Sequence, residues 1–151
     1  AERGGIAKNS AKMVYAMATA QVPRLTLIVG GSYGAGNYGM CGRGFWPEFL
    51  FTWPTAECAT MSADIASNVM LELRRTSVRL GPATDDELAA IDGQVRAQYG
   101  EQSDPYYATS RLWDDGIIAP HESRDVLGLC LALCASRDAL PERGRRRVFR
   151  M

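Results

Sequence analysis

Residues 30–44 read Gly30-Gly31-Ser32-Tyr33-Gly34-Ala35-Gly36-Asn37-Tyr38-Gly39-Met40-Cys41-Gly42-Arg43-Gly44, and this glycine-rich block has glycine at seven of its fifteen positions. It follows the near-continuous apolar run Leu25–Val29, which is typical of a strand buried on both faces. Because glycine is so frequent in the block, its backbone must matter more than its side chains. We therefore expect the loop to turn into a short helix at Ala35 and Gly36.

Short strands and helices alternate on both sides of the block. Proline ends several of them, since it lacks an amide donor and disfavours helix in the residue before it. This alternation predicts an α/β fold with no internal repeat or linker to divide it. The predicted elements are a helix capped by Asn9 or Ser10 and running through Ala11–Ala18, strands at Phe49–Trp53 and Glu57–Met61, helices at Ala63–Arg75 behind the cap Ser62 and from the capping box at Thr84 to about Tyr99, a strand at Ile117–Ile118 and a helix from Glu122 to about Ala139.

The composition fits one globular domain of 151 residues. Lys plus Arg equals Asp plus Glu at 17 each, so no overall field draws the molecule to nucleic acid or to an anionic membrane. The arginines between Arg143 and Arg150 indicate a solvated or interface-capping tail. The apolar run Val126–Ala135 is far shorter than the ~20 residues of a spanning helix, and we expect a soluble chain.

The cysteines and the single histidine do not suggest a metal site. No CxxC pair is present among the four cysteines, and one histidine cannot complete a zinc set. Cys130 and Cys134 stand one helical turn apart in an apolar run, which suits buried thiols in a reducing compartment. His121 is expected on the surface, near the start of the last predicted helix.

Gly34-Ala35-Gly36-Asn37-Tyr38-Gly39 matches the pattern GxGxxG directly after a predicted strand, which raises the hypothesis of a dinucleotide-binding turn. That turn must open a helix long enough to return along the sheet. Gly39, Gly42, Gly44 and Pro47 leave room for barely two helical turns, so this weak signal carries little weight.

An oxyanion cradle is the other chemical use of such a block. Small residues at a helix N-terminus let backbone N–H groups converge on a developing negative charge, and no side chain is needed. Ala35 and Gly36 occupy that position. A tight packing turn explains the glycines equally well, so from the residues alone both interpretations stay open.

The chain resembles the beta subunits of methylcrotonyl-CoA carboxylases, and the related geranyl-CoA carboxylases share most of the block. The resemblance rests on segments in the same order and spacing over nearly the whole chain: the glycine-rich block, Arg3-Gly4-Gly5-Ile6-Ala7-Lys8-Asn9, Ala20-Gln21-Val22-Pro23, Trp53-Pro54, Pro105-Tyr106-Tyr107, Trp113-Asp114-Asp115-Gly116-Ile117-Ile118 and Phe149-Arg150-Met151. It implies a crotonase-type α/β fold, a spiral of strand-strand-helix units. Residues 1–151 are then the C-terminal, biotin-facing part of the second carboxyltransferase domain of a longer chain, which fits a first segment with neither an initiating Met nor a signal peptide.

The resemblance implies transfer of a carboxyl group from N1-carboxybiotin to the γ-carbon of 3-methylcrotonyl-CoA or geranyl-CoA. The family's oxyanion hole for biotin aligns with the amides of Ala35 and Gly36, and Tyr33, Gly34, Asn37 and Tyr38 flank it as candidates to line the biotin pocket. Packing is the plainer function of these aromatic side chains. Arg43 is expected to fix the loop through carbonyl bonds or an interface pair.

The implied partners are a biotin-carrying alpha subunit, further beta subunits in a homo-oligomer, and the acyl-CoA substrate. Lys12 in Ala11-Lys12-Met13 lies in a helical pattern and not in a biotin-presenting hairpin, so biotin is expected on a different polypeptide, and no metal is expected. The compartment is a mitochondrial matrix or a bacterial cytoplasm.

Two departures from the family pattern favour an alternative, a non-catalytic relative that serves assembly only. Ser62-Ala63 replaces two glycines of a turn, and Ala119 stands where an aspartate is usual, which removes a cap or an acceptor. The intact glycine-rich block opposes this alternative.

Overall fold

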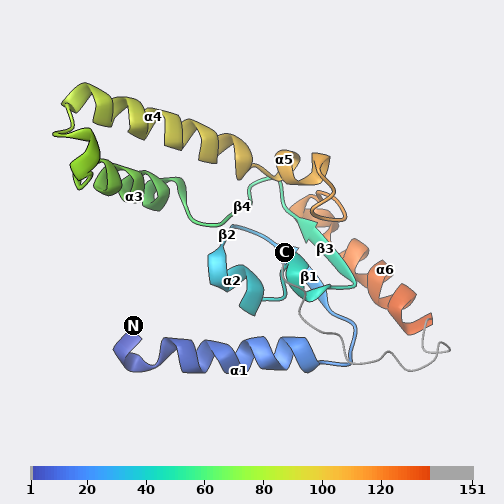
Figure 1. Cartoon of the computed structure of the whole chain (residues 1–151). Helices are drawn as coiled ribbons and strands as arrows, with labels where there is room; N and C mark the ends of the chain where they lie inside the picture. The colour runs from blue at the N-terminus through green and yellow to red at the C-terminus, as the bar shows by residue number, and fades with distance from the viewer. Residues whose placement is uncertain (1, 137–151) are drawn as a thin grey trace.

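A computed structural model describes residues 2–136 (Figure 1). The predicted arginine tail between Arg143 and Arg150, and any continuation of the last helix beyond Ser136, lie outside the described residues. Among those described, no helix is both long and apolar enough to cross a membrane.

Two strand-strand-helix units follow one another along the chain and stack. The strands that occupy equivalent places pair in parallel, β1 with β3 and β2 with β4. This arrangement confirms the predicted α/β class and the stacked units. The first unit consists of β1 (Leu25–Ile28), β2 (Gly31–Tyr33) and α2 (Gly34–Gly39), and the second of β3 (Phe49–Thr52), β4 (Glu57–Ala59) and α3 (Ala63–Arg75).

A third unit begins beside β3. Ile117 forms a single parallel bridge with Thr52, so the predicted strand at Ile117–Ile118 is reduced to this bridge. Gly116 and Ile118 hydrogen-bond to the backbone of Thr52 on either side of it. The elements outside the two units are η1 (Glu2–Gly4), α1 (Ile6–Thr19), η2 (Arg43–Phe45), η3 (Val78–Leu80), α4 (Asp85–Gln102), α5 (Pro105–Ser110), η4 (Pro120–Glu122) and α6 (Ser123–Ser136).

Helix boundaries follow the capping residues in two of three predicted cases. The Ser62 hydroxyl accepts from the amide of Ile65, and Thr84 forms a full capping box with Glu87. The prediction that Asn9 or Ser10 caps the first helix is wrong. The helix begins at Ile6, because the amide of Asn9 already donates to the carbonyl of Gly5 over 3.0 Å.

The core is a small cluster between the units. Ile28, Leu50 and Ala56 are 8%, 3% and 1% exposed, with Cys58 packed against them. The prediction that Leu25–Val29 is buried on both faces is wrong, since only Ile28 is buried and Val29 lies exposed beyond the end of the strand. The reason is that β1 pairs with β3 alone among the described strands, and a hollow of about 380 Å³ lies beside β1.

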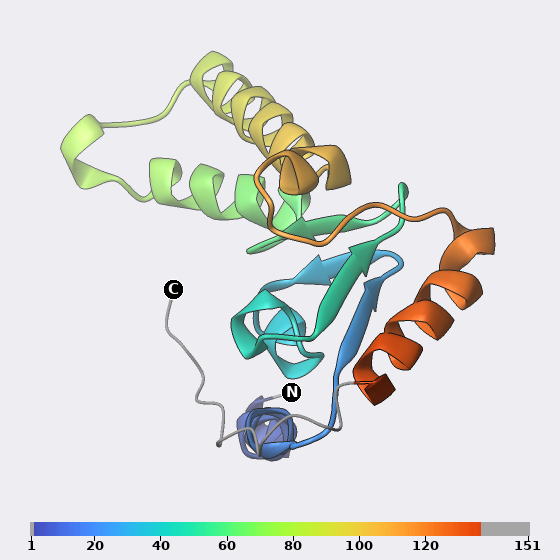
Figure 2. The same cartoon turned by 90° about the vertical axis from the view of Figure 1, so that its right-hand side faces the viewer.

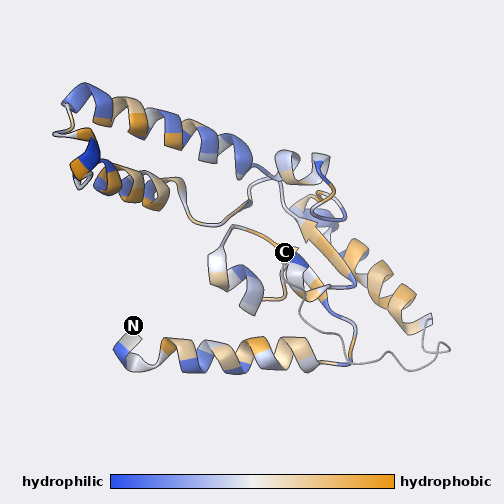
Figure 3. Cartoon of the chain, viewed as in Figure 1, coloured by the Kyte–Doolittle hydropathy of each residue, from blue (hydrophilic) through white to orange (hydrophobic). Residues whose placement is uncertain are grey.

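Helices surround the strands unevenly. In both Figure 1 and Figure 2, α2 and α6 lie on opposite sides of the β1–β3 pair, and α3 and α4 run as an arm away from it. Within this arm α4 is mostly hydrophilic, whereas α6 is mostly apolar (Figure 3). The short helix α2 lies between the strands and α1 in both views, and its first turn directly follows the end of β2.

Candidate functional site

Gly34 opens α2 in a conformation that favours glycine. Its φ is +52°, and a Cβ atom here would lie 3.0 Å from the carbonyl oxygen of Thr60. Tyr33, the residue before it, is extended and makes no side-chain cap. The amides of the first turn therefore have neither an intrahelical acceptor nor a capping side chain.

Ala35 and Gly36 supply two adjacent amides of this turn, as the sequence predicted. Both residues are exposed, and a Cβ atom added to Gly36 would meet nothing within 4 Å. Within residues 2–136, no backbone acceptor outside the helix takes either amide proton. Two neighbouring donors beside open space fit an oxyanion cradle better than a packing turn.

The length of α2 argues against the dinucleotide-binding hypothesis. The helix has six residues and ends at Gly39. A dinucleotide-binding turn needs a helix that returns along the whole sheet. The prediction that the block leaves room for a short helix only is confirmed.

Tyr33 is held by the neighbouring strand. Its hydroxyl donates to the carboxylate of Glu57 in β4. This hydrogen bond, together with partial burial and the negative charge of Glu57, raises the pKa of Tyr33 to about 12. The phenol therefore stays protonated at neutral pH and acts as a fixed donor, not as an acid. No local pattern in the sequence indicated Glu57 as a partner, because only the pairing of β2 with β4 brings it close to Tyr33.

Asn37 faces inward from α2. Its side-chain nitrogen donates to the Ser32 hydroxyl at 2.9 Å and to the Cys58 sulfur at 3.7 Å. Its backbone carbonyl accepts from the amide of Gly42 at 2.7 Å. A Cβ atom at residue 42 would lie 1.8 Å from the Asn37 side-chain oxygen, so glycine is required there for close approach. Neither Ser32 nor Cys58 could be recognised from the sequence as a partner of Asn37.

Tyr38 packs over the end of the block. Its ring meets Phe45 edge-on at 6.1 Å between centroids, and a Cβ atom on Gly44 would lie 2.9 Å from the Tyr38 ring. Tyr38 as a whole is 40% exposed, so part of the residue remains open to solvent. Tyr38 therefore has the packing function that its glycine neighbours indicated. Its exposed part lies near the first turn of α2.

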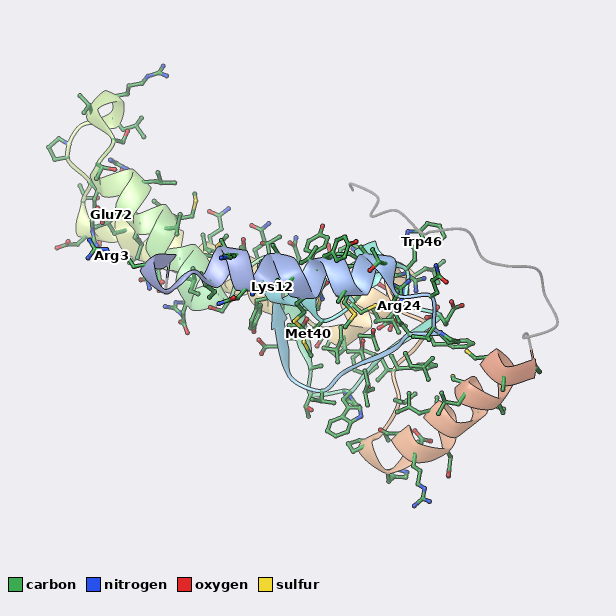
Figure 4. All side chains as sticks on the ribbon, turned by 90° about the horizontal axis from the view of Figure 1, so that it is seen from below. Arg3, Lys12, Arg24, Met40, Trp46 and Glu72 are labelled. Atoms are coloured by element: carbon green, nitrogen blue, oxygen red, sulfur yellow. The ribbon has the colours of Figure 1, made fainter. Side chains whose placement is uncertain are left out.

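Two arginines fix the segments around α2. Arg43 pairs with Asp115 at 3.2 Å, within the chain and not through carbonyls. Arg24 donates to the carbonyls of Met17 and Trp46, and so joins the end of α1 to the loop after α2. Figure 4 shows Arg24 and Trp46 at the same end of α1, with Lys12 farther along that helix. Lys12 thus lies in a helix, as predicted.

The nearby thiol does not provide a nucleophile. Burial, and then the negative charge of Asp114, raise the pKa of Cys58, which keeps it protonated. Cys130 and Cys134 are buried free thiols and His121 is exposed, as predicted. Residues 2–136 contain no group of three or more His, Cys, Asp or Glu side chains able to hold a metal ion. The chemistry that this site offers is hydrogen-bond donation by backbone.

The two departures from the family pattern fit the backbone differently. Ser62 has φ −68°, which any residue adopts, and it caps α3, so no glycine is needed there. Ala119 precedes η4 without a side-chain cap. The Glu122 carboxylate accepts from the Ala119 amide at 2.8 Å, which secures this turn from the other side.

Comparison with known proteins places these features in a family. The sequence-family model of the carboxyl transferase domain matches residues 1–148 of this chain. The chain is 52% identical over 136 residues to the biotin-dependent 3-methylcrotonyl-coenzyme A carboxylase beta1 subunit of Mycobacterium tuberculosis, covering 89% of this chain and 26% of the relative. It is 46% identical over 153 residues to the mitochondrial methylcrotonoyl-CoA carboxylase beta chain of Arabidopsis thaliana, covering 100% of this chain and 26% of the relative.

A solved structure agrees with this relationship. The geranyl-CoA carboxylase beta subunit of P. aeruginosa superimposes with a TM-score of 0.84 at 40% identity, covering 99% of this chain and 28% of that one. The chain thus spans about a quarter of the length of the relatives it matches.

Proposed function

Because this chain belongs to the carboxyl transferase domain family, we propose that it is the biotin-facing part of a carboxyltransferase subunit acting on an α,β-unsaturated acyl-CoA. The crotonase-type fold predicted from the resemblance is confirmed by the likeness to the geranyl-CoA carboxylase subunit. The observation that carries the proposal is the pair of adjacent donors, Ala35 and Gly36, in the exposed first turn of α2. The substrate is 3-methylcrotonyl-CoA or geranyl-CoA, and the domain is the C-terminal one of a longer subunit.

The residues of the first turn fit a biotin group. When bound, carboxybiotin supplies the carboxyl group and then a base. The amides of Ala35 and Gly36 would hold the ureido carbonyl oxygen of this group, and as hydrogen-bond donors they would stabilise negative charge on it. The helix N-terminus adds its own partial positive charge. Such donors need no reorganisation, because the φ of Gly34 and the Asn37 contacts already fix the turn.

Neighbouring side chains shape this half-site. Tyr33 and Tyr38 flank the turn, the first as a protonated phenol and the second as a partly exposed aromatic residue. Gly36 keeps the approach free of side-chain bulk, because a Cβ atom at this position would project into open space. The acyl-CoA end of the site is contributed by the first domain of a second beta subunit. The carboxybiotin arrives on an alpha subunit, so the active assembly is a hetero-oligomer in a mitochondrial matrix or a bacterial cytoplasm.

The non-catalytic alternative loses much of its support. It rested on Ser62-Ala63 and on Ala119. Ser62 keeps an ordinary backbone conformation and gains a cap, and the turn after Ala119 is secured by Glu122.

Incorporation of labelled bicarbonate tests the proposed activity. The full-length subunit is combined with its biotin-bearing partner, ATP and either 3-methylcrotonyl-CoA or geranyl-CoA. We expect acid-stable label in one of the two acyl-CoA products. An assembled complex that labels neither acyl-CoA, although its biotin becomes carboxylated, supports the non-catalytic alternative.

A further inference from the structure

Asn37 is the inward-facing polar side chain of α2, and the N–H groups of its carboxamide are engaged within the chain. One side-chain nitrogen serves two acceptors, Ser32 in β2 and Cys58 in β4. Its side-chain oxygen occupies the space beside Gly42. A carboxamide used in this way has no donor left for a bound molecule.

These contacts matter because little else fixes the inner face of α2. Asn37 borders two hollows, one of about 380 Å³ beside β1 and one of about 400 Å³ between β3 and α5. The helix has six residues and no buried residue of its own. Where apolar packing is sparse, hydrogen bonds to neighbouring strands decide the position of a short helix.

Asn37 also directly follows the amide pair in the chain. A shift of α2 moves the amides of Ala35 and Gly36 by the same amount, since all three belong to its first turns. Oxyanion stabilisation depends steeply on donor position. We infer that Asn37 is a positioning residue that holds the Ala35–Gly36 amides in register with β2 and β4 through Ser32 and Cys58. This inference rests on the proposed function and assigns Asn37 an indirect part in it, in place of direct contact with biotin.

The test compares Asn37→Ala with Asn68→Ala, a matched variant at an exposed position of α3. Both are made in the full-length subunit and assayed for carboxyl transfer with the biotin-bearing partner. For Asn37→Ala in assembled complex we expect kcat to fall by roughly ten- to a hundredfold, as for a small misplacement of catalytic groups, with KM for acyl-CoA unchanged. Asn68→Ala should keep the kcat of wild type.

A double-variant comparison separates positioning from general damage. In the Gly36→Pro background, which removes one of the two amide donors, Asn37→Ala should lower kcat much less than it does in wild type, because the two changes affect the same interaction. Equal losses in both backgrounds overturn the inference. A wild-type kcat for Asn37→Ala overturns it as well, while Gly36→Pro retaining full kcat overturns the proposed function itself.

If the Asn37→Ala subunit does not assemble, the Ser32→Ala variant tests the inference instead. This variant removes one acceptor of the Asn37 carboxamide and leaves the helix sequence intact. A lower kcat at unchanged KM supports the inference when the same variant lowers kcat much less in the Gly36→Pro background. An unchanged kcat contradicts it.

Discussion

The amide of Gly42 donates to the backbone carbonyl of Asn37 over 2.7 Å, and the Asn37 side chain fills the space that a Cβ atom on residue 42 would need. This contact closes the chain after α2 back onto the helix. Gly42 itself has φ −64°, a conformation open to every residue. Close approach, and not backbone conformation, therefore requires glycine at this position.

Gly42→Ala should destabilise the subunit by about 1–3 kcal/mol, the range for overpacking of a tight contact. The added carbon would lie 2.8 Å from the Asn37 carbonyl oxygen, which cannot move without moving α2. The matched control is Gly93→Ala in α4, where a Cβ atom meets nothing within 4 Å. That change should stabilise by roughly 0.5–1 kcal/mol, because alanine favours helix over glycine. Denaturant unfolding of both variants measures the difference, and equal effects would contradict the assigned contact.

The α3–α4 arm should depend on one buried hydroxyl. Ser67 in α3 is 0% exposed and donates to Asp92 in α4, which also accepts from Arg96 at 2.8 Å. Asp92→Ala leaves the Ser67 hydroxyl buried without an acceptor and should cost about 1–3 kcal/mol. Ser67→Ala removes the hydroxyl and leaves Asp92 paired, so it should cost less. Thermal unfolding that ranks Ser67→Ala as the worse variant would refute this account of the arm.

Local signals in the sequence predicted much of this structure correctly. Ser62 and Thr84 cap helices because their hydroxyls need only the amides three residues ahead. The short α2 could be predicted because Gly39 and Gly42 oppose helix continuation. Asn9 and Ser10 misled, since both residues are tolerated inside a helix that begins earlier.

Contacts between residues far apart in the chain could not be predicted from the sequence. The burial of Leu25–Val29 depends on which elements cover β1, and not on its apolar pattern. Asp115, the partner of Arg43, is 72 residues away in the chain. Tyr33 and Asn37 were selected for their place beside Gly34, but strand pairing decides that they contact Glu57 and Cys58.

Asp115 should matter more than its salt bridge with Arg43. The two side chains are 32% and 43% exposed, and a pair in this environment contributes little. Asp115 also accepts from the amide of Leu50 at 2.7 Å, and Leu50 is only 3% exposed. We expect Arg43→Ala to cost at most about 1 kcal/mol and Asp115→Ala to cost about 1–3 kcal/mol, because a buried amide loses its acceptor. Unfolding free energies of the two variants provide the measurement, and a larger loss for Arg43→Ala contradicts the expectation.

Alkaline stability should depend on Tyr33. Its hydrogen bond to Glu57 raises the pKa of its phenol from the usual 10.0 to about 12. The stabilisation linked to this shift is fully present below the ordinary pKa and is lost as pH rises through the folded-state pKa, since the unfolded chain releases the proton first. Tyr33→Phe should therefore lose less stability than wild type between about pH 10 and about pH 12. Tyr15→Phe, at a tyrosine that is 72% exposed, should follow wild type. Identical slopes for Tyr33→Phe and wild type in melting experiments would rule out this linkage.

The most direct test of the central claim is kcat for carboxyl transfer by the full-length subunit carrying Gly36→Pro, which removes one proposed oxyanion donor. Gly36→Ala, which keeps the amide and meets no atom of the chain within 4 Å, is the comparison. With assembly and biotin carboxylation intact, we expect Gly36→Pro to lose roughly a hundredfold or more in kcat and Gly36→Ala to lose far less. A Gly36→Pro complex that turns over as fast as wild type would contradict the claim that the first turn of α2 is the oxyanion cradle.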